Sequence, residues 1–148
     1  MKPIRTWILL ADGSRARFLL HDGPGKGLKS APLDDREIEV PPTRDLGSQR
    51  PGRSHDRFGQ GRHAMEETDW HRFEEARFAK EVAGLLNQAA KSDSYDRLIL
   101  VAPPKTLGDL RQALDSHSSK LIYRELGKDL TKIPDSQLPE HLDKVIAV

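Results

Sequence analysis

The amino-acid sequence predicts a single α/β domain that spans residues 1–148. The chain is long enough for one hydrophobic core and too short for two ordinary domains. Two apolar runs, Trp7–Ala11 and Arg15–His21, flank the turn-forming Asp12-Gly13-Ser14 and predict an N-terminal hairpin. Farther along, a helical pattern followed by a strand-like run occurs twice, which indicates parallel strands joined by crossovers. We therefore expect a mixed, mostly parallel sheet with helices packed on it.

The elements after the hairpin follow from the spacing of apolar residues. Arg36–Val40 alternates polar and apolar residues, which predicts a third strand at an edge of the sheet. A long helix is expected over Asp69–Ala90, with Phe73 off its apolar stripe. Leu98–Ala102 is apolar throughout, as is typical of a central strand buried on both faces. The residues of the helical stripe are Phe78, Val82, Leu85 and Ala89, flanked by Leu86.

The C-terminal part of the chain predicts two more helices around one more strand. Thr106 is a suitable N-cap for a short helix, and Asp109 would favour its first turn. Leu121–Leu126 predicts a strand, and a last helix is expected to open at Asp135 or Ser136. The apolar faces of these two helices consist of Leu107, Leu110 and Leu114, and of Leu138, Leu142 and Ile146.

Composition excludes several classes of function. The chain has no cysteine, which rules out a disulfide framework, a thiolate zinc site and a cysteine nucleophile. The apolar run at Trp7–Ala11 is too short for the core of a signal peptide, and no run is long enough to span a bilayer. We therefore expect a cytoplasmic protein without membrane association, and no cofactor is implied. The net charge of +1 means that affinity for nucleic acid would have to come from local clustering.

One segment is locally basic. Residues 41–68 contain three prolines and four glycines with few large aliphatic residues, so we expect a long, flexible loop before the main helix. Between Arg44 and Arg62 there are five arginines against two acidic residues. A loop of this length in a compact domain is usually functional or disordered. The segment is therefore where we expect the function to lie.

Three other patterns suggest chemistry more weakly. The run from Gly47 to Ser54 is similar to a phosphate-binding P-loop, but it lacks the strand before it and the helix directly after it. His55, His63 and His71 are eight residues apart, and two of them lie in the irregular segment, so we expect no metal site. Asp12 and Asp96 could lie at the ends of neighbouring strands and bind magnesium, as in a metal-dependent nuclease. Turn formation by Asp12 and an exposed Asp96 explain these two residues equally well.

The run Arg57-Phe58-Gly59-Gln60-Gly61-Arg62-His63 is the strongest candidate for a site. A glutamine between two glycines places a polar side chain on a backbone that can approach another backbone closely. The arginines supply attraction for phosphates, and Phe58 or His63 could stack on a base. A solvated basic loop without a ligand explains the same residues, and the residues alone leave both interpretations open.

The sequence also resembles a family, the bacterial host-attachment proteins ("protein required for attachment to host cells"). These in turn resemble the middle domain of archaeal and eukaryotic class I peptide-chain release factors. The resemblance covers nearly the whole chain, and it rests on the order and spacing of several short motifs. The motifs are Ala11-Asp12-Gly13-Ser14-Arg15-Ala16, Gly52-Arg53-Ser54, Gly61-Arg62-His63-Ala64-Met65, Phe78-Ala79-Lys80-Glu81-Val82-Ala83, Tyr95 to Pro104, Leu107-Gly108-Asp109-Leu110-Arg111 and Lys128-Asp129-Leu130-Thr131.

The resemblance implies a release-factor-like fold and a role for the basic loop. In release factors, a Gly-Gly-Gln loop before a long helix enters the peptidyl-transferase centre, where the glutamine helps to place the water that cleaves peptidyl-tRNA. Here Gly59-Gln60 matches two of the three residues, while Phe58 replaces the first glycine. An aromatic side chain hinders the close approach that paired glycines permit, so the sequence leaves open whether the protein is an enzyme.

We therefore expect an RNA- or ribosome-associated module that acts through the loop from Arg44 to Met65, with peptidyl-tRNA as a candidate substrate. Gln60 would be the catalytic residue, between Gly59 and Gly61. The residues expected to bind nucleic acid are Arg50, Arg53, Arg57, Arg62 and His63. Two alternatives remain: a non-catalytic module that docks a protein partner through the loop and Phe73 and affects attachment indirectly, and a metal-dependent nuclease.

Overall fold

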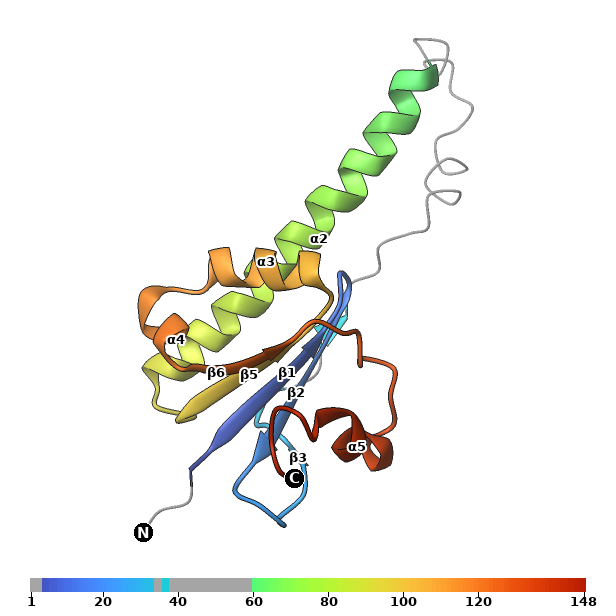
Figure 1. Cartoon of the computed structure of the whole chain (residues 1–148). Helices are drawn as coiled ribbons and strands as arrows, with labels where there is room; N and C mark the ends of the chain where they lie inside the picture. Colours follow the sequence, from blue (N-terminus) through green and yellow to red (C-terminus); the bar gives the residue numbers. More distant parts are fainter. Residues whose placement is uncertain (1–3, 34–35, 38–59) are drawn as a thin grey trace.

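The protein folds as one mixed sheet with helices on both faces (Figure 1). The computed structural model describes residues 4–33, 36–37 and 60–148, with the backbone alone at 36–37 and 60–68. The strand order is β3-β2-β1-β5-β6, and β4 also pairs with β2. The strands are β1 (Thr6–Ala11), β2 (Arg15–His21), β3 (Lys29–Ser30), β4 (Arg36–Glu37), β5 (Arg97–Val101) and β6 (Ile122–Leu126). The helices are α2 (Gln60–Lys91), α3 (Pro104–Ala113), α4 (Ser116–Lys120), η2 (Asp135–Gln137) and α5 (Leu138–Leu142).

The predicted N-terminal hairpin is confirmed. β1 and β2 are antiparallel, with Thr6 opposite His21 and Ala11 opposite Ala16. The turn between them is closed by the Asp12 amide, which donates to the Arg15 carbonyl oxygen at 2.9 Å. The side chain of Asp12 also stabilises this turn, because its Oδ1 accepts hydrogen bonds from the backbone amides of Ser14 and Arg15. This contact explains why an aspartate occupies the position.

The predicted crossovers are also confirmed. β1 pairs with β5 and β5 pairs with β6, both in parallel, and α2 and α3–α4 provide the connections. All side chains of β1 are buried, as are those of Leu98 to Val101 in β5, because both faces of the sheet are covered. The two-residue strands β3 and β4 add antiparallel pairings to β2 on the other side of the sheet.

Alternate residues of the strands build two cores. Trp7 and Leu9 point to the face under α2 and α3, where they pack with Phe78, Val82 and Leu86 of α2. The opposite face is covered by the C-terminal segment. Its core consists of Ile8, Leu10, Leu19, Ile99, Val101, Leu130, Leu138, Leu142, Val145 and Ile146.

The main helix differs from its prediction. α2 begins at Gln60, nine residues before the predicted start at Asp69, so the last part of the predicted loop 41–68 is helical. The intervening Ala64-Met65-Glu66-Glu67 are strong helix formers, a signal that apolar periodicity alone does not detect. Within the helix, Leu86 is fully buried, while Leu85 is half-buried and packs against the same core, so the stripe is centred on Leu86 and Leu85 lies at its edge.

Smaller differences occur where elements are short. α3 begins at Pro104 and not after Thr106, because a proline is well suited to the first turn of a helix. β3 and α4 are only two and five residues long and were not predicted. The last helix is a turn of 3-10 helix followed by α5, and its three predicted apolar residues are buried. No helix in the described part of the chain is long and apolar enough to cross a membrane.

Candidate functional site

The structure places four of the predicted site residues on one short stretch of backbone. Gln60, Gly61, Arg62 and His63 form the beginning of α2. The other predicted residues lie outside the described residues: Gly59, Arg50, Arg53 and Arg57. The start of α2 lies far from the sheet, since the helix projects beyond the rest of the fold (Figure 1). Its first turn contains no acidic residue, so nothing within that turn offsets the positive end of the helix dipole.

The projecting helix is anchored by its middle and its C-terminal half. Arg72 is the first described residue of α2 with a hydrogen bond to another element, and Phe78 is the first that is fully buried. An α-helix rises about 1.5 Å per residue, so the start of α2 lies about 18 Å along the helix axis from Arg72. Residues 44–65 therefore include the end of the helix that is farthest from the sheet.

The anchor is an ion pair between α2 and α3. The Nη1 and Nη2 atoms of Arg72 donate to Oδ2 and Oδ1 of Asp109, at 2.7 and 2.6 Å. The hydrogen bonds from Arg72 to Asp109 raise the pKa of the guanidinium above its ordinary value. The sequence suggested that Asp109 acts on the dipole of its own helix. In the structure, Asp109 faces α2 and binds Arg72. A two-point contact of this kind fixes direction as well as distance.

A cavity of about 470 Å³ opens at the carboxyl ends of β1 and β5, beside this anchor. It is lined by residues of the β1–β2 turn, of α2 and of the start of α3. A Cβ at Gly13 would lie 2.4 Å from Oε2 of Glu75, so a larger residue here would force the Glu75 side chain to move. The Nε2 atom of His71 is buried without a hydrogen-bond partner in the described part of the protein. The lining residues are Asp12, Gly13, Ser14, His71, Glu75, Pro103, Lys105 and Thr106.

Both carboxylate oxygens of Asp12 form hydrogen bonds that stabilise the fold. Its Oδ1 accepts hydrogen bonds from the amides of Ser14 and Arg15, at 2.9 and 2.8 Å. Its Oδ2 lies 3.1 Å from the hydroxyl of Thr131, which is 2.6 Å from Oδ1 of Asp129. This network ties the hairpin turn to the segment after β6. Sequence reasoning missed it, although Asp129-Leu130-Thr131 has the composition of a turn closed by an aspartate side chain.

The pairing of Asp12 with Asp96 that a nuclease would need is wrong. Asp12 follows the last residue of β1, whereas Asp96 precedes β5 and bonds to Arg5 at the other end of the same strands. A strand rises about 3.3 Å per residue, so the two carboxylates lie on the order of 20 Å apart. Among the described residues, no group of three or more histidines, aspartates or glutamates could hold a metal ion.

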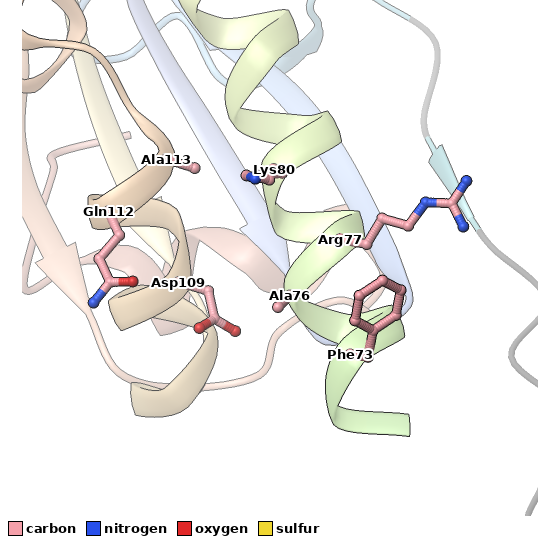
Figure 2. A pocket seen from close by; sticks show the side chains of 7 residues that line it. All are labelled: Phe73, Ala76, Arg77, Lys80, Asp109, Gln112 and Ala113. Carbon is pink, nitrogen blue, oxygen red and sulfur yellow. The ribbon is translucent and has the colours of Figure 1, made fainter. Parts of the chain in front are cut away.

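A second cavity, of about 350 Å³, lies between α2 and α3 (Figure 2). Phe73, Ala76, Arg77 and Lys80 line it from α2, and Asp109, Gln112 and Ala113 line it from α3. Phe73, which the sequence placed off the apolar stripe, is 60% exposed. Its ring stacks near that of Trp70, with the centroids 6.3 Å apart, and Trp70 is also exposed. The aromatic pair lies on the surface. The helical periodicity of the sequence indicated this for Phe73, but it did not identify Trp70.

The chain is similar to solved structures in its fold and to one protein family in its sequence. No curated protein matches the sequence. One similar solved structure is described as the archaeal translation termination factor aRF1 (16% identity, TM-score 0.47), and another as an archaeal protein (16% identity, TM-score 0.50). The matches cover 95% and 97% of this chain but only 38% and 35% of those chains, so the protein spans little more than a third of their length. At 16% identity, the likeness to the second of these structures concerns the fold alone.

The family is shown by sequence. A family model described as "protein required for attachment to host cells" matches residues 7–142, which include every strand from β2 to β6 and almost all of β1. The matched range contains the hairpin turn, α2 with its anchor, and both cavities. The chain therefore belongs to the family of proteins required for attachment to host cells.

Proposed function

We propose that this protein is an RNA-binding module that acts on the ribosome, and that residues 44–65 contact the RNA. The observation that carries the proposal is the projection of α2 away from the sheet, with its N-terminus at Gln60 (Figure 1). A helix anchored at Arg72 and Phe78 can hold its N-terminal end in a narrow space that the sheet itself could not enter. The arginine-rich residues directly precede that end.

Electrostatics support a negatively charged ligand at this end of the helix. The N-terminus of an α-helix carries a partial positive charge and free amide donors, and the first turn of α2 contains no acidic residue. Arg50, Arg53, Arg57 and Arg62 add formal positive charge in a chain whose net charge is only +1. In this proposal the arginines bind phosphates and His63 stacks on a base.

The proposed substrate class is peptidyl-tRNA. Gln60 would orient the attacking water, while Gly59 and Gly61 would allow the backbone to approach the ester. The RNA would supply much of the remaining site. A role on the ribosome places the protein in the cytoplasm, and the effect on attachment to host cells would then be indirect.

The test is co-sedimentation of the full chain with ribosomes at about 50 and 200 mM salt. We expect salt-sensitive binding by the wild type, and weaker binding with a shallower salt dependence for the double variant Arg53→Ala/Arg62→Ala. Each phosphate contact with a single strand contributes about −0.7 to the slope of log affinity against log salt, so the slope should fall by about 1.4. The matched control is Lys26→Ala/Lys144→Ala, which removes the same charge from exposed positions elsewhere.

Two further outcomes decide between binding and catalysis. Loss of peptidyl-tRNA hydrolysis in Gln60→Ala, with ribosome binding retained, would assign the catalytic role. Binding without any hydrolysis by the wild type would limit the function to RNA recognition. No association at low salt, or equal loss in both double variants, would contradict the proposal.

A second candidate function is the docking of a protein partner in the groove between α2 and α3. The observation that favours it is the exposed Trp70–Phe73 pair beside a groove of about 350 Å³. Arg77 and Lys80 line the groove, while its Asp109 is already paired with Arg72, so the groove suits an acidic segment with an apolar anchor. Binding through aromatic anchors should depend less on salt than RNA binding, and Phe73→Ser should abolish it without affecting ribosome association.

A further inference from the structure

Polar and aromatic residues occupy neighbouring positions on adjacent strands near the amino ends of β5 and β6. They lie on the face of the sheet that also packs against α5. Thr6 pairs with both His21 and Arg97, and the parallel pairing then continues from β5 to β6. The register shifts between Leu98 and Ile99, whose partners are Ile122 and Arg124. Tyr123 is therefore the extra residue of a bulge on β6, at the edge of the sheet. A bulge of this kind re-aims the side chains around it.

The bulge brings two arginines onto one aromatic ring. The Cζ atom of Arg97 lies 3.9 Å from the ring centroid of Tyr123, and that of Arg124 lies 4.4 Å from it. The Nε atom of Arg97 donates to the hydroxyl of the fully buried Thr6 at 2.7 Å, which holds this guanidinium in place. Tyr123 as a whole residue is 38% exposed. We call these three residues, Arg97, Tyr123 and Arg124, the arginine–tyrosine cluster.

The arginines of the cluster differ in charge balance from five other arginines in the described part of the chain. Within the described residues, neither Arg97 nor Arg124 forms an ion pair with a carboxylate. Five other arginines do: Arg5, Arg17, Arg72, Arg77 and Arg111. Both guanidinium groups lie within 4.4 Å of a single ring centroid, so their separation is comparable to the screening length of about 8 to 10 Å. Two neighbouring like charges without a counter-charge favour the binding of an anion.

We propose that the arginine–tyrosine cluster is a second binding site for single-stranded RNA, separate from residues 44–65. Its arginines bind backbone phosphate, and an unpaired base stacks on the exposed planar groups. The inference rests on the proposed function only in the choice of RNA as the ligand. The cluster lies at the C-terminal end of α2 and the amino end of β5, whereas residues 44–65 include the opposite end of α2 (Figure 1).

The planar groups favour RNA over an acidic protein segment. Proteins stack unpaired bases on aromatic rings and on planar guanidinium groups, and the fork of an arginine matches the oxygens of a phosphate. The edge position of β6 leaves the strand open on its outer side in the described part of the sheet. A carboxylate would satisfy the charge of the cluster, but it would leave its planar faces unused.

The test is fluorescence anisotropy of the full chain with a labelled oligouridine of about 12 nucleotides, a length within the usual range for one binding site. Three single variants are compared with the wild type: Tyr123→Leu, Arg124→Gln and, as the control, Lys128→Gln. Lys128 is an exposed cation just after β6 and lies outside the cluster. Circular dichroism verifies that each variant folds. A parallel measurement cross-links a 4-thiouridine oligonucleotide to the protein and identifies the modified peptide.

We expect Tyr123→Leu and Arg124→Gln each to weaken binding by about fivefold or more, because one stacked base contributes that much. Lys128→Gln should remain close to the wild type, and the cross-link should map to residues 121–126. Wild-type affinity in both cluster variants, or a cross-link confined to other peptides, would overturn the inference. Equal competition by polyglutamate, with the same dependence on Arg124, would overturn it in favour of an acidic protein partner.

The oligouridine assay and the ribosome assay together separate this inference from the proposed function. If Arg53→Ala/Arg62→Ala removes ribosome binding while the cluster variants behave as the wild type, the proposed function stands and the second site is rejected. If the cluster variants lose oligouridine affinity while Arg53→Ala/Arg62→Ala keeps its ribosome binding, the second site stands and the role of residues 44–65 is rejected.

Discussion

Arg72 of α2 and Asp109 of α3 are joined by two parallel hydrogen bonds, at 2.7 and 2.6 Å, at the point where α2 leaves the sheet. The pair is half-exposed on the arginine side and largely buried on the aspartate side. It therefore restrains the base of the projecting helix without filling the core. Glu75 lies 3.9 Å from the same guanidinium and also covers Gly13, so the ion pair, the hairpin turn and the helix meet at one place.

We expect a double-mutant cycle on Arg72→Ala and Asp109→Ala to give a coupling of about 1 kcal/mol in the free energy of unfolding, measured by urea denaturation. The value is modest because solvent screens the arginine, and it exceeds that of a fully exposed pair because the contact is bidentate. The more exposed pair Arg111–Glu125 is the control and should couple less. A cycle with no coupling would show that the pair does not anchor α2.

Substitution of two phenylalanines on the same helix should change the free energy of unfolding by very different amounts. Phe78 is 2% exposed and packs in the core under α2, whereas Phe73 is 60% exposed. We expect Phe78→Ala to lower the free energy of unfolding by about 3 kcal/mol, since a buried ring is replaced by a cavity. Phe73→Ser should change it by less than about 0.5 kcal/mol. Thermal unfolding of the two variants tests this, and a large loss for Phe73→Ser would mean that its ring is buried in solution.

Local patterns predicted the parts of this fold that depend on neighbours in sequence. The hairpin was predicted to within one residue, because apolar runs and turn residues specify it directly. β5 was predicted because a strand covered on both faces is apolar throughout. The start of α2 was missed because Gly59 and Gly61 indicated a loop, although the residues after them favour a helix.

Contacts between distant residues could not be predicted. Arg72 and Asp109 are 37 positions apart, and Arg97 meets Tyr123 only because a bulge on β6 shifts the register. The network of Asp12, Thr131 and Asp129 likewise depends on how the segment after β6 returns to the hairpin. The proposed roles of Gln60 and the arginines before it rest on the sequence, because the side chains concerned lie outside the described part.

The hydroxyl of Thr131 links two carboxylates, and its removal should be costly. Thr131 is 6% exposed, and its Oγ1 atom lies 2.6 Å from Asp129 and 3.1 Å from Asp12. We expect Thr131→Val to lower the free energy of unfolding by about 1 to 2 kcal/mol, because the hydroxyl donates its one hydrogen to either carboxylate and that hydrogen bond is lost. Thr131→Ser keeps the hydroxyl and should lose less than half as much. Equal losses in urea denaturation of the two variants would assign the effect to packing instead.

His21 should make the protein less stable in mild acid. His21 is 1% exposed, and burial lowers its pKa below the ordinary value of 6.5; the nearby Arg97 also lowers it, while the backbone of Val148 and the charge of Asp22 oppose the shift. Above pH 6.5 both the folded and unfolded forms have a neutral ring, so the folded state keeps its full stability. As the pH falls below 6.5, the unfolded chain takes up the proton first, and stability is lost until the folded pKa is passed. Unfolding measured at pH 7.5 and pH 5 should therefore show a smaller loss for His21→Gln than for the wild type. An identical loss in the two proteins would mean that His21 is not buried as a neutral ring.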